Sequence, residues 1–152
     1  RAIVGMVDYV MSAYVRGQLF LGVVIGVVTG IAMWLIGIPQ SLVLGVLAGF
    51  FELIPVLGPW IAFVVAALVT LATEPGRILF VGIAFLAIQQ LENTFLVPKI
   101  QGDAVRVHPA MIMILLVVGG SLWGVLGMIF IVPLTAVLRD IFVYLYHRTG
   151  KV

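Results

Sequence analysis

The sequence predicts an all-α, polytopic integral membrane bundle. Of its 152 residues, 64% are hydrophobic and 9% are charged, and the mean hydropathy is +1.32, whereas an ordinary soluble domain carries about 25% charged residues. Several apolar stretches approach or exceed the ~18 residues that mark a spanning helix. Because these stretches are continuous and lack an alternation of period two, they indicate spanning helices and not a membrane barrel.

The composition also excludes several functional classes. The net charge of +2 is spread along the chain without a basic stripe, so no nucleic-acid partner is expected. The sequence has no cysteine, only two histidines and no HExxH spacing, so no metal site is expected. No GxSxG, P-loop or dinucleotide fingerprint occurs, and we therefore expect neither an enzyme nor a bound cofactor.

Residues 1–16 predict an amphipathic helix at the membrane surface, because apolar side chains recur at helical spacing while Asp8 and Ser12 lie on another face. Residues 17–38 then run for 22 positions without a charge. As a helix this run is about 33 Å long, which is enough to cross the bilayer. Within this span every fourth residue is a glycine, which predicts a smooth stripe for close packing against another helix. The stripe comprises Gly22, Gly26 and Gly30.

Residues 40–74 predict a broken pair of short helices. The run 41–54 has 14 residues, and the run after Pro59 ends near Thr73. Each run is only about 21 to 23 Å long as a helix, too short to cross ~30 Å of hydrocarbon upright. Two interpretations stay open: a re-entrant hairpin that leaves by the face it entered, or two short, tilted spans.

Two prolines and a glycine mark the break itself. Proline has no N–H, so Pro55 and Pro59 deprive the carbonyls of Phe51 and Pro55 of their helical partners. Gly58 can take a left-handed cap geometry, and Pro59 suits the first position of a new helix. The pattern therefore predicts a helix stop and restart, with free carbonyls before it and free N–H groups after it.

Glu52 directly precedes this break. The helix dipole and burial both disfavour a bare carboxylate at a helix C-terminus in a membrane, so Glu52 should be protonated, paired or bound to a cation. Ionisable residues at membrane depth indicate function by default. Glu52 is therefore a candidate proton or cation site, and the alternative is that it lies at a hairpin tip near water or pairs with a basic side chain.

Residues 78–97 predict the next spanning helix, and its second half is polar. Gln89, Glu92 and Asn93 are spaced i, i+3 and i+4 on one helical face, with Gln90 beside them. A helix from Ile78 reaches Glu92 after about 21 Å, still inside the hydrocarbon. Such a face should point into the bundle, where it would either bind a polar substrate or lock the helices together.

A polar cytoplasmic loop is expected at 98–109, followed by a second broken pair at 110–138 and a cytoplasmic tail at 139–152. The loop ends with His108, read as a loop residue, and with Pro109 as the first residue of the next helix. The second pair turns at the glycine-rich tip "GGSLWGVLG" of residues 119–127. The break and hinge residues of this pair are Gly119, Gly120, Gly124, Gly127 and Pro133.

The two blocks predict an inverted repeat, each block being a spanning helix followed by a broken pair. A shift of 70 positions places Pro39 on Pro109 and Gly49 on Gly119. If each broken pair returns to the side it left, the second block starts on the side opposite to the first, as in many secondary transporters. Of the basic residues only Arg77 then lies on the other side, so both chain ends should be cytoplasmic.

Four separated motifs, in order over nearly the whole chain, resemble one known family. They are "ELIPVLGP" (52–59), "QQLENTFLVPKIQG" (89–102), "HP" (108–109) and "GGSLWGVLGMIFIVPL" (119–134). Together they are similar to the bacterial autoinducer-2 exporter family, also called PerM-like permeases. The positions that match the family motifs are Glu52, Pro55, Gly58, Pro59, Gln89, Gln90, Glu92, Pro98, Lys99, Gly102, His108, Pro109, Gly119, Gly120, Gly124, Gly127 and Pro133.

The resemblance implies a permease of the bacterial inner membrane. Some members of the family are proposed to export a small polar signalling molecule, and others to exchange sodium for protons. Family members are longer, with further spanning helices before the matching region, so this chain resembles a C-terminal half. The family often has an aromatic residue where this chain has Val56, and a glycine where it has Arg106.

The sequence thus predicts a secondary transporter of a small polar solute such as autoinducer-2, driven by an ion gradient. Solute would bind between the two breaks and the face of residues 89–93, with Glu52 or Glu92 carrying a proton or cation. The expected partners are membrane lipid, the solute, a proton or sodium ion, and either further copies of the chain or a missing N-terminal half. Two alternatives stay open: a sodium/proton antiporter on the same fold, and a non-transporting scaffold that assembles through the glycine stripe.

Overall fold

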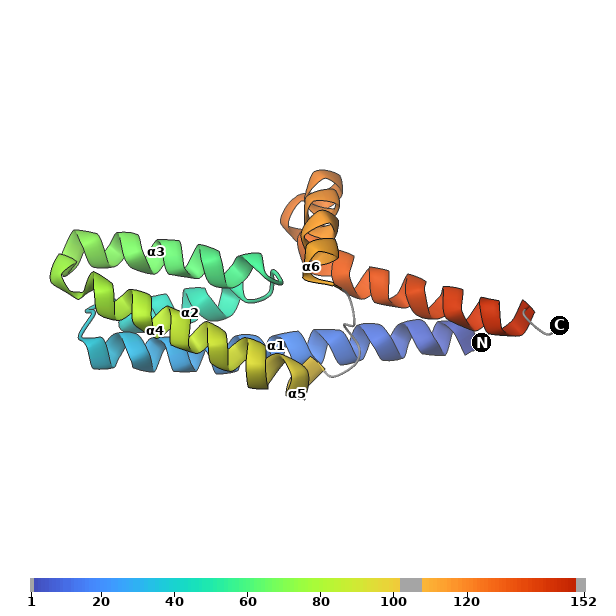
Figure 1. Cartoon of the computed structure of the whole chain (residues 1–152), viewed down its shortest axis with the longest axis horizontal. Coiled ribbons are helices and arrows are strands. Elements are labelled where there is room, and N and C mark those ends of the chain that lie inside the picture. Colours follow the sequence, from blue (N-terminus) through green and yellow to red (C-terminus); the bar gives the residue numbers. More distant parts are fainter. Residues whose placement is uncertain (1, 102–107, 150–152) are drawn as a thin grey trace. The chain divides into compact units, whose positions relative to one another are not determined.

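A computed structural model describes residues 2–101 and 108–149 of the chain (Figure 1). The described residues fold into helices and no strands. The helices are α1 (Ala2–Ile36), α2 (Ser41–Phe51), α3 (Leu57–Thr73), the 3-10 turn η1 (Pro75–Arg77), α4 (Ile78–Leu91), the π-helical turn η2 (Glu92–Leu96), α5 (Val97–Gln101) and α6 (Pro109–Thr149).

Three helical segments are long and apolar enough to span a membrane. They are Val7–Ile36, Pro75–Ile100 and Ala110–Tyr146, and α2 and α3 are shorter apolar helices. The prediction of an all-α, multi-pass membrane protein is therefore confirmed.

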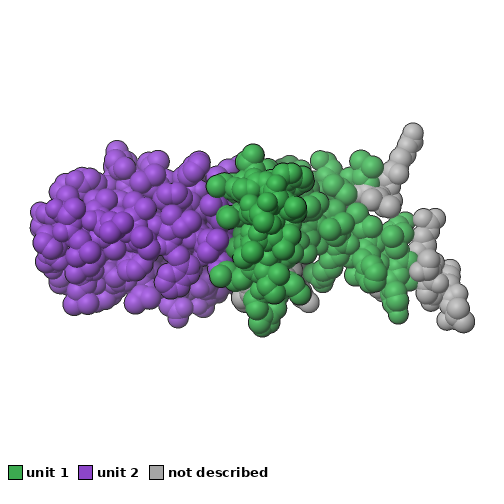
Figure 2. Space-filling model, turned by 90° about the horizontal axis from the view of Figure 1, so that it is seen from above, with its two compact units in different colours: residues 1–16, 103–152 green, residues 17–102 purple. Residues whose placement is uncertain are grey.

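The chain divides into two compact units (Figure 2). Unit 2 is residues 17–102, and unit 1 combines residues 1–16 with residues 103–152. The division falls inside α1, so this helix contributes its first part to unit 1 and its remainder to unit 2. Each unit is described by itself below.

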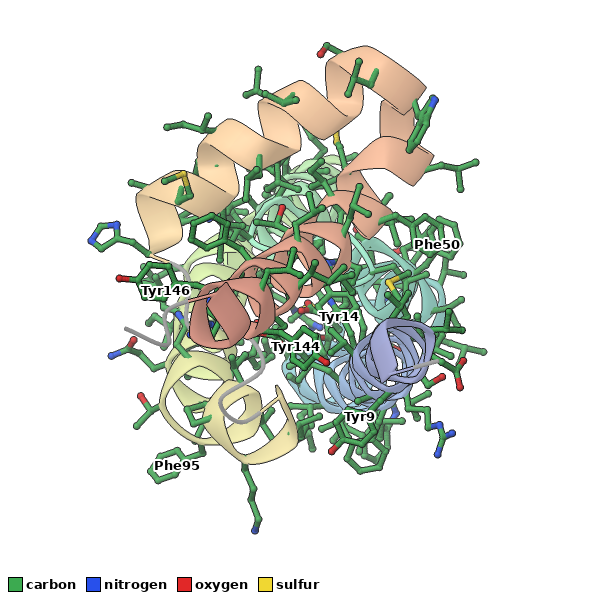
Figure 3. All side chains as sticks on the ribbon, turned by 90° about the vertical axis from the view of Figure 1, so that its right-hand side faces the viewer. Tyr9, Tyr14, Phe50, Phe95, Tyr144 and Tyr146 are labelled. Atoms are coloured by element: carbon green, nitrogen blue, oxygen red, sulfur yellow. The ribbon has the colours of Figure 1, made fainter. Side chains whose placement is uncertain are left out.

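Unit 2 is a bundle of four successive antiparallel helices, formed by residues 17–36 of α1 with α2, α3 and α4 (Figure 1). Two apolar clusters hold it together. One contains Met33, Ile38, Leu44, Ala66 and Val81, and the other contains Leu21, Ile25 and Ile88. The outer surface is apolar as well, and Figure 3 shows Phe50 and Phe95 projecting away from the bundle. Such a surface suits a lipid environment.

Helices α1 and α2 approach each other through glycines. A Cβ atom added to Gly22 would lie 2.8 Å from the carbonyl oxygen of Gly49, and one added to Gly45 would lie 2.7 Å from that of Gly26. A Cβ atom added to Gly30 would lie 3.6 Å from the Cα atom of Gly45, which is an ordinary contact distance. A side chain on Gly22 or Gly45 would push the two backbones apart.

The break between α2 and α3 satisfies its backbone locally. The Ile54 N–H donates to the carbonyl of Phe51 at 2.9 Å, and the Leu57 N–H donates to that of Pro55 at 2.7 Å. The carbonyls that the two prolines deprive of helical partners are therefore not free, contrary to the prediction. Helix α3 already begins at Leu57, so Pro59 is its third residue.

The prediction of a left-handed Gly58 is wrong. The residue with positive φ in this turn is Val56, with φ 66°. Gly58 is needed for space instead, because an added Cβ would lie 2.6 Å from the carbonyl carbon of Phe51. The physical reason is that the start of α3 packs directly on the last turn of α2.

Beyond α4 the helix continues further than the sequence indicates. It runs through η2 and α5 to Gln101, although a loop was expected from Pro98. In η2 the Val97 N–H donates to the carbonyl of Glu92, five residues back. This wider turn displaces the carbonyls that a proline ring would otherwise clash with, so Pro98 is accommodated inside the helix.

In unit 1, α6 is broken at Trp123 and Gly124, whose backbone angles are not helical. The chain reverses there, and Gly119 packs against Gly127, since a Cβ on Gly119 would lie 2.6 Å from the Gly127 carbonyl oxygen. The arm after the break continues to Thr149, past residue 138 where the sequence pattern ended it. Ala136 and Val137 are buried on this arm, while Leu138 and Arg139 are exposed. The helix therefore continues beyond the fully apolar run with one buried apolar face.

Candidate functional site

Glu52 and Glu92 meet inside unit 2. Their side chains are 2% and 5% exposed, and both line the same small cavity. Two ionised carboxylates that share a buried site would repel each other strongly, so such a site favours a proton on one of them. We therefore expect the pair to share a proton in this arrangement.

Each member of this carboxyl pair stands where a helix is irregular. Glu52 is the residue that ends α2 at the break, and Glu92 begins the π-helical turn that follows α4. π-helical turns occur frequently at functional sites. The carboxyl pair thus joins a broken helix pair to an irregular point of a spanning helix.

Gln18 of α1 fixes the backbone of the break. Its side-chain amide donates a hydrogen bond to the backbone carbonyl of Glu52, and the side chain is 3% exposed. In a continuous helix this carbonyl would accept from the N–H of Val56, but Val56 has left the helix. Gln18 supplies the missing donor and holds the end of α2 against α1.

A small cavity lies beside the carboxyl pair. Its volume is about 10 Å³, which is close to the minimum that holds one water molecule. Its polar lining comes from Thr29, Glu52, Gln89 and Glu92, and its apolar lining comes from Ile25, Ala48, Pro59, Ala62, Phe85 and Ile88. Two polar atoms of this lining, Thr29 Oγ1 and Glu52 Oε2, are buried without a hydrogen-bond partner.

The polar residues predicted on α4 do not form a single inward face. Glu92 is buried and Gln89 is half-buried, whereas Gln90 and Asn93 are exposed. Gln89 donates to the Oδ1 atom of Asn93 at 3.4 Å. The buried face of the helix is centred on positions 88 and 92, so position 89 falls on its edge and positions 90 and 93 fall outside it.

Of the other predicted residues, Pro59 lines the cavity. Pro98 and Lys99 are exposed in α5, and the exposed His108 accepts a hydrogen bond from the N–H of Ala110 at 3.3 Å. Gly102 lies outside the described residues. Pro109 begins α6, where Gly119, Gly127 and Pro133 are buried, Gly120 adjoins Met128, and Gly124 is exposed at the tip.

The sequence interpretation missed Gln18 and Thr29. Both are buried polar residues of the first span, and they are eleven positions apart. Eleven residues make almost exactly three helical turns, so the two side chains share a face of α1. Their position on one face of an otherwise apolar run is the signal that could have found them.

Comparison with known proteins supplies the family. Residues 1–147 match the family described as the AI-2E family transporter. The protein YrrI of Bacillus subtilis (strain 168) is 38% identical over 138 residues, which cover 91% of this chain and 39% of that protein. PerM of Escherichia coli (strain K12) is 33% identical over 136 residues, covering 86% of this chain and 38% of that protein.

YrrI is named provisionally as a transport protein, and PerM is named provisionally as a permease. The chain spans less than half of the length of either relative. No solved structure matches it. From the match over residues 1–147, the chain belongs to the AI-2E transporter family.

Proposed function

We propose that this chain is the membrane-embedded part of an ion-coupled secondary transporter, with the carboxyl pair as its proton site. The observation that carries the proposal is the meeting of Glu52 and Glu92 inside an apolar bundle, at a helix break. Burying ionisable groups in a membrane is costly, and such groups mark ion pathways and proton relays in transporters. Helix packing alone does not require them.

The place of Glu52 in the bundle supports this role. A Cβ atom on Gly22 would lie 3.9 Å from the Glu52 Cβ, and Gly22 stands near the middle of the apolar segment Val7–Ile36. Transporters commonly bind substrate and coupling ions near the bilayer midplane, where discontinuous helices meet. Glu52 would therefore lie near half depth.

The hairpin formed by α2 and α3 begins and ends at one end of unit 2. Arg77, after α3, donates through Nη1 to the carbonyl of Ile36 at 2.9 Å and to that of Gly37, and Gly37 stands between α1 and α2. The tip at Glu52 lies beside Gly22, near the middle of the apolar segment of α1, so the hairpin would turn back near half depth. A turn at half depth favours the re-entrant hairpin over two short spans. With Arg77 on the outer side and most basic residues on the other, both chain ends would face the cytoplasm.

The transport cycle would use the carboxyl pair as a proton carrier. While Glu52 and Glu92 share the buried site, a proton on one of them is held away from water. A movement that separates the tip of the hairpin from α4 would expose both carboxyl groups, and the proton could then leave to the opposite side. Gln18 ties the tip to α1, so this movement would be a shift of α1 with α2 against α4.

The solute would contact the polar edge beside the carboxyl pair. The cavity of about 10 Å³ is too small for any organic solute. The amides of Gln89, Gln90 and Asn93 stand next to Glu92 on the half-buried and exposed side of the helix, where they can hydrogen-bond a small polar molecule. Autoinducer-2 is the solute that the family resemblance suggests.

A sodium/proton antiporter is the second candidate function. The observation that favours it is the same cavity, which has two carboxyl groups and no room for an organic molecule. The stripe of Gly22, Gly26 and Gly30 packs against α2 of the same chain, which weighs against the scaffold alternative.

Flux measurements in proteoliposomes test the proposal. The protein, its Glu52→Gln and Glu92→Gln variants and a Glu74→Gln control are compared under an imposed proton gradient, with autoinducer-2 or sodium as the second species. Glu74 is a partly exposed glutamate of the same unit, and its side chain pairs with Arg77, so its variant should transport normally. We expect at least a tenfold loss of coupled flux in Glu52→Gln and Glu92→Gln. Unchanged coupling in both variants would remove the proposal, and flux with sodium alone would select the antiporter.

A further inference from the structure

We infer that the cavity beside the carboxyl pair binds a single water molecule between Thr29 and Glu52, and that this water is part of the proton site. The inference rests on the proposed role of the carboxyl pair. It assigns to Thr29 of α1 a part in that site, as the residue that positions the water.

Thr29 differs from other threonines of the chain in its hydrogen bonding. The hydroxyl groups of Thr70, Thr73 and Thr135 each donate to the carbonyl four residues earlier, at 2.7 to 2.9 Å. Thr29 is 1% exposed, and its Oγ1 atom makes no such bond. Because buried hydroxyl groups are almost always paired with protein or ordered water, the Thr29 hydroxyl needs a partner in the cavity that it lines.

Glu52 also has a buried oxygen atom that needs a hydrogen-bond partner. Its carboxyl group shares the cavity with that of Glu92, and its Oε2 atom is buried without a hydrogen-bond partner. Thr29 and Glu52 both line the cavity, from α1 and from the end of α2. One hydroxyl and one carboxyl oxygen are the partners that a bridging water molecule uses, since water both donates and accepts.

The size and the walls of the cavity favour water over a divalent metal cation. The volume of about 10 Å³ admits one water-sized particle. Its oxygen-bearing side chains are Thr29, Glu52, Gln89 and Glu92, and the rest of the wall is hydrocarbon. Hard cations of the calcium and magnesium type take about six or more oxygen ligands, which this wall does not offer.

Besides Glu52, one titratable residue lines the cavity. Glu92, the first residue of η2, is the other titratable group that lines the cavity, α3 lines it with Pro59 and Ala62, and α1 lines it with Ile25 and Thr29. No lysine, arginine or histidine is among the residues that line it. A water molecule that donates to the free oxygen of Glu52 is therefore the group best placed to stabilise this carboxylate when the proton leaves.

Infrared difference spectroscopy in ordinary and heavy-oxygen water tests the inference without measuring transport. The spectra compare the protein before and after a pH step that changes the protonation of the carboxyl pair. We expect an isotope-sensitive O–H band of one internal water in the wild type and in Thr29→Ser, which keeps the hydroxyl. The band should disappear in Thr29→Val, which has nearly the same shape. Thr70→Val is the matched control, because the Thr70 hydroxyl bonds to the carbonyl of Ala66 and not to the cavity.

Two results would overturn the inference: no isotope-sensitive band in the wild type, or the same band in Thr29→Val. Displacement of the band by sodium ions at constant pH would also overturn it, by showing a cation site. If Thr29→Val does not fold, Thr29→Ala serves the same comparison. Failure here is separable from failure of the proposed function, because the flux assay of Glu52→Gln and Glu92→Gln does not depend on the water band.

Discussion

The break between α2 and α3 encloses polar groups, whereas the break inside α6 packs backbone against backbone. In the described part of the chain, the buried polar or charged side chains other than Tyr14 all belong to unit 2, and three of them surround the first break. These three are Gln18, Glu52 and Glu92. At the second break, Trp123 and Gly124 are exposed.

The two breaks nevertheless share their backbone construction. Each has one residue with positive φ, Val56 at 66° and Gly124 at 61°. Each also has a glycine whose Cβ would overlap a neighbouring backbone, Gly58 against Phe51 and Gly127 against Gly119. The comparison teaches that prolines and glycines make a break, and that only the polar groups placed around it make a candidate site.

The largest expected effects come from the glycines that the two breaks share. In Gly58→Ala and Gly127→Ala, the new Cβ would lie 2.6 Å from a backbone carbonyl carbon in both cases. Because backbone atoms cannot rotate away as a side chain can, we expect each variant to lose about 3 kcal/mol of unfolding free energy or more. Thermal unfolding in detergent measures the loss. Gly82→Ala is the control, since its Cβ meets nothing within 4 Å, and it should be neutral or slightly stabilising. A stable Gly127→Ala would show that the second break is looser than the first.

A double-mutant cycle on the carboxyl pair tests whether the polar content of the first break acts as a unit. Glu52→Leu and Glu92→Leu each leave the other carboxyl group buried without its partner, and we expect each to cost about 2 kcal/mol. The double variant should cost clearly less than the sum, because neither group is then left unpaired. Chemical unfolding in detergent gives the values.

Ser121→Ala is the matched change near the second break. Its hydroxyl is exposed and donates to the carbonyl of Val118 at 2.8 Å, so its loss should stay within about 0.5 kcal/mol. Strict additivity in the Glu52 and Glu92 cycle would contradict the view that these residues form a coupled pair.

Arg77 tests the other end of the hairpin, away from the break. Its guanidinium group donates to the carbonyls of Ile36 and Gly37, where a basic group also complements the helix dipole. We expect Arg77→Met to cost about 1.5 kcal/mol. Glu74→Gln removes only the ion pair of 3.6 Å with Arg77, which is partly exposed and should be worth about 0.5 kcal/mol or less. Equal losses in the two variants would mean that the ion pair, and not the bonds to α1, fixes this end.

Changes at the two positive-φ residues are expected to have modest effects of opposite sign. Val56→Gly should stabilise the protein by about 1 kcal/mol, because a β-branched residue is strained in that conformation. Gly124→Ala should destabilise it by about the same amount for the same reason, since the space around Gly124 is open. Unfolding measurements on both variants check the signs. A loss of coupled flux in Val56→Gly with gained stability would indicate that the strain at the first break serves transport.

Much of the fold follows from local patterns in the sequence. Continuous apolar runs predict the spanning helices, and Pro55 and Pro59 predict the interruption after α2. Glu52 and Glu92 are recognisable as candidates one at a time, since each is a carboxyl group at membrane depth. The proposed inverted repeat stays a prediction, because its two blocks fall largely in different units that are each described by themselves.

Other features could not be read from local patterns. The meeting of Glu52 with Glu92 depends on how α2 and α4 pack, and so does the bond from Gln18 to the Glu52 carbonyl. The left-handed Val56 in place of Gly58 depends on the contact between α3 and the last turn of α2. Each of these is set by residues from another helix.

The sequence by itself determined the membrane class, the helices and the place of the first break. These follow from apolar content and from backbone hydrogen bonds between near neighbours in the chain. Only the tertiary structure decided which polar groups share the interior, which helix the glycine stripe meets, and that Thr29 and Glu52 line one cavity of about 10 Å³. The physical reason is that these contacts join residues far apart in the chain, and close packing in three dimensions, not local periodicity, brings them together.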